Sequence, residues 1–193
     1  MKFLLINLLL IFSIGFAGNA QNKVSEKTKE ANELLLAAAL HGNVQDIKKA
    51  LSLGADINCM NAKGETALNM VAKLSYEFLV AYLIEKGAQV NTANNDKITP
   101  LHWAVEYDNV VLVKLLLENG ANIKATDGIQ ETPLHWAAWT GNIASAKLLL
   151  QYAANPYVGN NSGVTPIDLT IRQEHKKLEQ LLKKKKYMNR KNG

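Results

Sequence analysis

Residues 99–104 read Thr-Pro-Leu-His-Trp-Ala, and the same six residues return at 132–137. A leucine-rich segment follows each copy, at 110–118 and at 146–150. The frame set by the offset between the two copies extends in both directions without an insertion or deletion. It places a threonine near the start of four units and a glycine near the end of three, at Thr66, Thr99, Thr132 and Thr165, and at Gly54, Gly87 and Gly120.

The hexapeptide predicts the start of a helix. The hydroxyl of Thr99 can accept a hydrogen bond from a free backbone N–H, and Pro100 at the first helical position has no N–H to leave unpaired. His102, third in the helix, can reach back toward the threonine. Apolar residues then recur at spacings of three and four, which predicts two short amphipathic helices, and Gly120 is typical of a helix end. Helices this short must pack on neighbouring units to be stable.

A 33-residue period that carries T-P-L-H-x-A resembles the ankyrin repeat. The resemblance covers about four fifths of the chain and implies an all-α solenoid of five helix-turn-helix units, with N- and C-terminal capping repeats. The predicted ankyrin domain spans residues 31–186, with units at about 28–60, 61–93, 94–126, 127–159 and 160–186.

Several units depart from this pattern. Glu33 replaces the threonine in unit one, and unit two has Ala67 for the proline and Asn69 for the histidine. Unit four has Ala153 where other units have glycine. If the backbone is left-handed there, alanine costs roughly 1 kcal/mol relative to glycine.

The first twenty residues predict a signal peptide. Lys2 precedes a mostly apolar segment at 3–16, and small residues at 17–20 suit cleavage after Ala20. The alternative is an uncleaved membrane anchor, but roughly 14 apolar residues are few against the ~20 that a spanning helix needs. We therefore expect export, to the periplasm in a Gram-negative bacterium and otherwise to the exterior, with no transmembrane span in the mature chain. Residues 21–30 are polar and predict a linker, or alternatively a frayed leading helix.

The sequence offers poor candidates for catalysis. His102 and His135 occupy equivalent positions, so repeat stacking separates them by ~8 to 10 Å, whereas two zinc-bound nitrogens each lie ~2 Å from the metal. We interpret both as structural. Cys59 is the only cysteine, so it forms no internal disulfide, and we interpret it as a loop residue. The sequence contains no phosphate loop, zinc signature or nucleophile elbow. We predict no enzyme activity, no metal and no cofactor.

The ankyrin resemblance implies a concave recognition surface, made by the inter-unit turns and the exposed side of each first helix. Three of the residues placed there, Tyr107, Trp139 and Arg172, are of types enriched at interface hot spots. The alternative for Trp139 is that it folds down over its neighbour. By contrast, Trp103 and Trp136 are predicted to pack between units in the core. The predicted partner-binding residues are Lys73, Leu74, Ile98, Glu106, Tyr107, Ile129, Glu131, Trp139, Thr140 and Arg172.

Positive charge gathers at the C-terminus. From residue 172 onward the chain has nine Lys or Arg and two Glu, a net charge of +7, whereas residues 21–171 carry a net charge of −3. Four consecutive lysines, Lys183, Lys184, Lys185 and Lys186, precede a basic tail at 187–193. They suit an anionic membrane surface or polyanion, or else a solvated helix end whose lysines oppose the helix dipole. A nucleic acid partner is not expected, because interleaved aromatic residues are absent.

The resulting functional hypothesis is an exported, monomeric scaffold that binds a partner protein through its concave face and performs no catalysis. The alternative is electrostatic attachment through the lysine-rich C-terminus. Since ankyrin repeats serve many unrelated partners, the resemblance names no particular target. Periplasmic adaptors and secreted factors acting on a host both remain open.

Overall fold

The computed structural model describes residues 25–184, and within them the chain is helical. A helix over residues 25–41 is followed by nine more, which are α2 (Val44–Ser52), α3 (Ala67–Lys73), α4 (Glu77–Glu85), α5 (Pro100–Glu106), α6 (Val110–Glu118), α7 (Pro133–Thr140), α8 (Ile143–Gln151), α9 (Pro166–Arg172) and α10 (Lys176–Leu182). No strand forms in this range, where an isolated β-bridge joins Met60 and Thr66.

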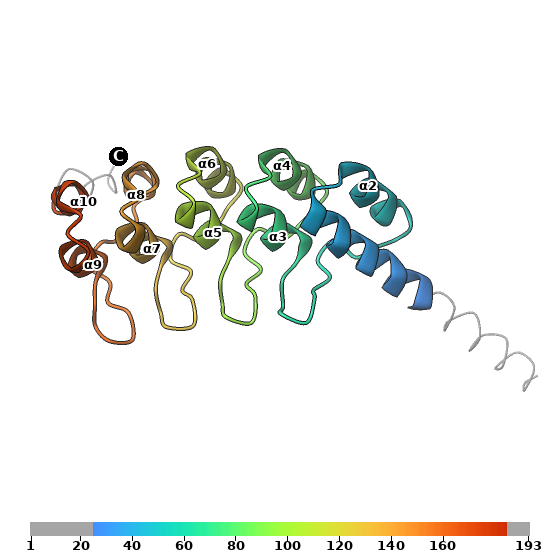
Figure 1. Ribbon diagram of the computed structural model, residues 1–193, viewed down its shortest axis with the longest axis horizontal. Helices are drawn as coiled ribbons and strands as arrows, with labels where there is room; N and C mark the ends of the chain where they lie inside the picture. The colour runs from blue at the N-terminus through green and yellow to red at the C-terminus, as the bar shows by residue number, and fades with distance from the viewer. Residues whose placement is uncertain (1–24, 185–193) are drawn as a thin grey trace, which may run out of the picture.

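The helices stack in two rows (Figure 1). One row begins with the helix at 25–41 and continues with the first helices of the later units, α3, α5, α7 and α9. The other row consists of the second helices, α2, α4, α6, α8 and α10. Long loops connect one pair to the next and project beyond the α3 row. The all-α solenoid of five helix pairs predicted from the repeat is confirmed.

The four repeat threonines each act as the N-cap of a first helix, as the hexapeptide predicts. In α5, Nδ1 of His102 lies 2.8 Å from the hydroxyl oxygen of Thr99 and accepts the Thr99 backbone N–H at 3.2 Å. Asn69 fills the same role in unit two, where its Oδ1 accepts the backbone N–H of Thr66 at 3.0 Å. The departure from histidine in unit two therefore preserves the cap.

The backbone just after the second helices α2, α4, α6 and α8 is left-handed. Gly87 and Gly120 have φ of +94° and +84°, and Ala153 has φ of +67° at the equivalent position. Ala153 therefore has the left-handed backbone for which an alanine costs roughly 1 kcal/mol relative to glycine.

The core runs between the two rows. Leucines at equivalent positions are at most 1% exposed, and they are Leu68, Leu101 and Leu134 in the first helices and Leu83, Leu116 and Leu149 in the second. Because the rows bury these leucines against neighbouring units, each helix pair is stabilised by the pairs next to it. Truncating one of these leucines to alanine costs about 2–5 kcal/mol of folding free energy.

The ends of the array differ in part from the prediction. Residues 25–30, predicted as a linker or a leading helix, are helical and continue without a break into the first unit. Residues 21–24 and the predicted signal peptide at 1–20 lie outside the described residues. Among the helices of residues 25–184, none combines the length and apolar character that crossing a bilayer requires.

Candidate functional site

Each inter-unit loop is held by one Asx side chain. Oδ1 of Asp127 accepts the backbone N–H groups of Ile129 and Glu131, at 3.0 and 2.8 Å. The same pair of hydrogen bonds is made at the equivalent positions by Asn61, Asn94 and Asn160. Since one oxygen takes both N–H groups, the tip of each loop is fixed relative to the helix that follows it. We call the surface formed by these loops and the exposed sides of α3, α5, α7 and α9 the loop face; it corresponds to the predicted concave face.

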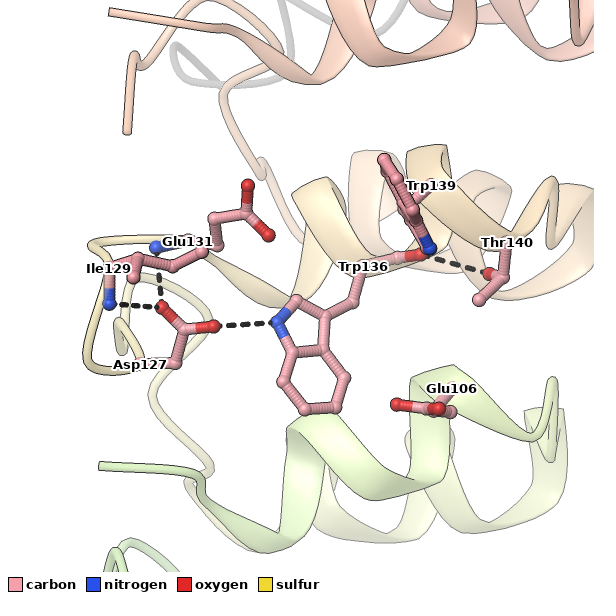
Figure 2. Close-up of a pocket in the computed structure, with 7 residues that line it drawn as sticks. All are labelled: Glu106, Asp127, Ile129, Glu131, Trp136, Trp139 and Thr140. Carbon is pink, nitrogen blue, oxygen red and sulfur yellow. Dashed lines mark hydrogen bonds between the residues drawn. The ribbon is translucent and has the colours of Figure 1, made fainter. Parts of the chain in front are cut away.

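A hollow of about 370 Å³ lies on the loop face between α5 and α7 (Figure 2). One of its residues comes from α5, three from the loop before α7 and three from α7 itself. They are Glu106, Asp127, Ile129, Glu131, Trp136, Trp139 and Thr140. We call this hollow the tryptophan pocket.

The indole of Trp136 is fixed from two sides. Its Nε1–H donates to Oδ2 of Asp127 at 2.9 Å, the same carboxylate that holds the loop. Its ring meets Trp103 edge to face, with centroids 5.6 Å apart, and also lies against His102. The wall of the pocket is therefore held in place by contacts within the protein itself.

The rim of the pocket is apolar and exposed. Trp139 and Ile129 each expose 57% of their surface. The alternative in which Trp139 folds down over its neighbour does not match this exposure. The carbonyl oxygen of Trp139 lies 3.2 Å from Nε2 of His175 in the next unit, so the backbone that presents the indole is also tethered.

Three carboxylates line the tryptophan pocket. The carboxylate of Asp127 already accepts hydrogen bonds from Trp136 and from the loop backbone. Oε1 of Glu131 accepts a hydrogen bond from Nδ2 of Asn160 at 2.8 Å. Within residues 25–184, Glu106 has no side-chain hydrogen bond and none of the three carboxylates forms a salt bridge. The pocket is thus lined by negative charge that the described part of the chain leaves unneutralised.

A second hollow of about 400 Å³ lies one unit earlier, between α3 and α5. There Nζ of Lys73 sits over the ring of Trp103, 4.5 Å from its centroid, and 4.0 Å from Oε1 of Glu65. The Nε1–H of Trp103 is buried without a hydrogen-bond partner among the described residues. The lining residues are Ala62, Lys63, Glu65, Lys73, Asn94, Asn95, Asp96, Ile98 and Trp103.

Seven of the ten predicted partner-binding residues line these two hollows. Glu106, Ile129, Glu131, Trp139 and Thr140 line the tryptophan pocket, and Lys73 and Ile98 line the second hollow. The other three line neither hollow but lie exposed at the ends of first helices, and they are Leu74, Tyr107 and Arg172.

The placement predicted for Trp103 and Trp136 is correct only in part. Their rings meet edge to face between two units, as predicted, and Trp136 packs against the core. Both are half-buried rather than enclosed, however, and each lines a hollow on the loop face. The Asx series was also missed, although Asn61, Asn94 and Asp127 stand exactly one repeat period apart in the sequence. A tryptophan nine positions after an aspartate, whose second oxygen can accept the indole N–H, is the signal that could have indicated a surface contact between them.

His102 and His135, the histidines of the two T-P-L-H motifs, both form part of a helix cap. Nε2 of His102 lies 3.2 Å from the carbonyl oxygen of Glu131, and Nε2 of His135 lies 3.2 Å from that of Val164. Burial lowers the pKa of His102 to about 4 and also lowers the pKa of His135. Because Nδ1 of each ring accepts a backbone N–H, the neutral Nε2–H tautomer fits both sites. The described residues contain no group of three or more His, Cys, Asp or Glu placed to hold a metal ion.

Cys59 is half-buried, with its Sγ 3.9 Å from the carbonyl oxygen of Asn32. Burial and, to a lesser extent, the charge of Asp56 raise the pKa of its thiol to about 11. The thiol is therefore protonated at neutral pH, which makes it a poor nucleophile.

The C-terminal lysines are described only in part. Lys183 forms a salt bridge with Glu179 one helical turn earlier, at 2.5 Å, and Lys184 is exposed. Lys185, Lys186 and the predicted tail at 187–193 lie outside the described residues.

Comparison with known proteins agrees with the helix-pair architecture. A family model described as "Ankyrin repeats (3 copies)" matches residues 34–127, and one described as "Ankyrin repeat" matches residues 130–161. No curated protein matches the chain. Ankyrin repeats generally mediate protein–protein interaction and are typically non-catalytic. With two family models together matching more than half of its length, the chain belongs to the ankyrin repeat family.

Proposed function

We propose that the protein is an exported, monomeric ankyrin-repeat scaffold that binds a partner protein through its loop face and performs no catalysis. The observation that carries the proposal is the tryptophan pocket, where Trp139 exposes 57% of its surface beside the fixed indole of Trp136. Large aromatic side chains in a preformed hollow are typical of interface hot spots. Tyr107, 53% exposed at the end of α5, adds a further contact of the same kind.

The test of partner binding is affinity capture from the native exported fraction, using the mature chain that begins at Gln21. Changing Trp139 or Tyr107 to Ala should then weaken the captured partner by at least ~1 kcal/mol each, about fivefold in dissociation constant. Phe78 on α4 is the matched control, because it is 65% exposed but belongs to the other row of helices. If the Trp139 and Tyr107 variants bind a verified partner as tightly as the Phe78 variant and the unmodified chain, the loop face is not the binding surface.

Export is supported by the sequence alone, through the charged, apolar and small-residue segments of residues 1–20. The mass of the product recovered outside the cytoplasm tests it. A chain that begins at Gln21 is the expected result, and a full-length chain retained in the membrane would favour the anchor instead.

The absence of catalysis is supported by what the histidines do. His102 and His135 are held against threonine caps in the row of first helices, and neither lines the tryptophan pocket. A turnover that disappears on changing either histidine while the helical circular dichroism stays intact would contradict the proposal.

Attachment through the C-terminal lysines is the alternative function. It is favoured by the charge distribution, since the net charge of +7 from residue 172 onward contrasts with a net negative charge over residues 21–171. Sedimentation with phosphatidylserine vesicles at low salt tests it, using a chain that ends at Leu182 as the control. Retention that is lost on truncation supports attachment, and no retention of the intact chain ends it.

A further inference from the structure

We infer that the tryptophan pocket receives a basic side chain, lysine or arginine, from the partner polypeptide. This inference rests on the proposed function, because it names the chemistry of the partner at the loop face. It is carried by the repeat itself, which builds the same indole wall twice and supplies a cation to only one copy within the described residues.

The second hollow shows how a cation is held on this scaffold. Nζ of Lys73 lies over the ring of Trp103, 4.5 Å from its centroid, a distance suited to a cation–π interaction. One repeat period later in the sequence, Trp136 occupies the position equivalent to Trp103, and Glu106 occupies the position equivalent to Lys73. The tryptophan pocket therefore has the indole but a carboxylate in place of the ammonium. No described residue supplies a cation in this register, and we assign that cation to the partner.

The charge of the tryptophan pocket complements a basic side chain. Glu106, Asp127 and Glu131 line it, and no described lysine, arginine or histidine does. After the hydrogen bonds to Asp127 and to Oε1 of Glu131, both oxygens of Glu106 and Oε2 of Glu131 still lack partners among the described residues. An ammonium or guanidinium group brings several N–H donors that these oxygens can accept.

The shape of the pocket suits a side chain rather than a bare metal ion. Its volume of about 370 Å³ falls at the lower end of the range of roughly 300–1,000 Å³ seen for small-ligand sites. Figure 2 shows the indole of Trp136 between Asp127 and Glu106, with Trp139 and Thr140 on the adjoining border. Apolar rings beside carboxylates can cover the methylene stem of a long basic residue while its charged end meets the oxygens.

The test uses blocked alanine peptides that carry one central lysine or arginine, and their uncharged counterparts with norleucine or citrulline. The indole N–H signals of the full chain, assigned by Trp→Phe variants, report binding in ¹H–¹⁵N NMR spectra. The inference predicts saturable shifts of the Trp136 and Trp139 signals with the basic peptides and at least tenfold weaker effects with the uncharged ones. Equal shifts from norleucine and lysine, or no shift from either basic peptide, would overturn it.

Variants of the acidic residues sharpen the test. Glu106→Gln combined with Glu131→Gln should weaken binding of the basic peptides at least tenfold. Glu118→Gln on α6 should leave it unchanged, because it removes a carboxylate that does not line the pocket. Unchanged affinity in the double variant contradicts the inference. If the double variant unfolds, the comparison of charged and uncharged peptides on the unmodified chain still decides the question.

The two proposals fail in different ways. A captured partner that needs Trp139 but tolerates the Glu106→Gln and Glu131→Gln changes retains the proposed function and refutes the basic side chain. A partner indifferent to Trp139 and Tyr107 refutes the proposed function, while the peptide titration independently reports whether the pocket prefers a cation.

Discussion

Trp136 and Asp127 are joined by a hydrogen bond of 2.9 Å that the previous unit lacks. There Asn94 replaces the aspartate, and its Oδ1 already accepts the N–H groups of Asp96 and Ile98. The amide nitrogen of Asn94 thus takes the place that Oδ2 has in Asp127, so a donor replaces the acceptor. This exchange explains why the buried Nε1–H of Trp103 has no partner among the described residues.

Changing Asn94 to Asp should stabilise the protein by about 1 kcal/mol, because Trp103 gains a hydrogen-bond acceptor. The reverse change, Asp127 to Asn, should destabilise it by about 1–3 kcal/mol, since it leaves the Nε1–H of Trp136 unpaired. Urea denaturation at neutral pH measures both. A loss of stability in Asn94→Asp would contradict this account of the loops.

The His102 cap predicts a pH dependence of stability. The folded-state pKa is lowered from 6.5 to about 4, so the unfolded chain binds the proton first as the pH falls. Stability from this group is therefore complete above pH 6.5 and is lost progressively between pH 6.5 and about 4. The shift corresponds to at most about 3 kcal/mol.

The variant His102→Asn isolates this effect, because Asn69 caps the equivalent helix without a titrating ring. The unfolding free energy of the unmodified chain minus that of the variant should decrease as the pH is lowered from 6.5 to about 4, because only the unmodified chain carries the histidine. The other titrating groups are common to both proteins and cancel in the difference. A difference that stays constant over this range would show that His102 does not carry the predicted dependence.

Ala153 offers a direct test of the left-handed turns. Its φ of +67° matches the glycines that end the other second helices, and at Gly87 and Gly120 an added Cβ would meet no atom within 4 Å. Backbone strain and not crowding is therefore the cost. Ala153→Gly should raise the unfolding free energy by about 1 kcal/mol, and Gly120→Ala should lower it by a similar amount. Thermal or urea unfolding of the two variants, in which opposite signs are required, checks the prediction.

Much of the fold could be predicted from the sequence because the physical signals are local and recur in every unit. Thr99 with Pro100 indicates a helix start, and apolar spacing indicates which face is buried. The outer boundary of the first unit was harder, since the helix at 25–41 begins in a polar segment that has no repeat signature.

The candidate site was predictable only in part. The frame placed Glu106 and Trp139 on the loop face. It also placed Trp136 in the core, whereas the structure leaves this side chain half-buried. The periodic pattern does not predict this difference, because burial at one helical position depends on how closely the neighbouring unit approaches. The hydrogen bond from Trp136 to Asp127 joins a helix to its preceding loop. Hydropathy patterns carry no information on such a polar contact.

The central claim is that the loop face is the partner-binding surface, and the affinity of a captured partner for Trp139→Ala tests it most directly. The account predicts a dissociation constant at least about fivefold weaker than that of the unmodified chain, with Phe78→Ala unchanged. Circular dichroism should show equal helicity in all three proteins. A partner that binds Trp139→Ala as tightly as the unmodified chain, or that loses affinity only with Phe78→Ala, would contradict it.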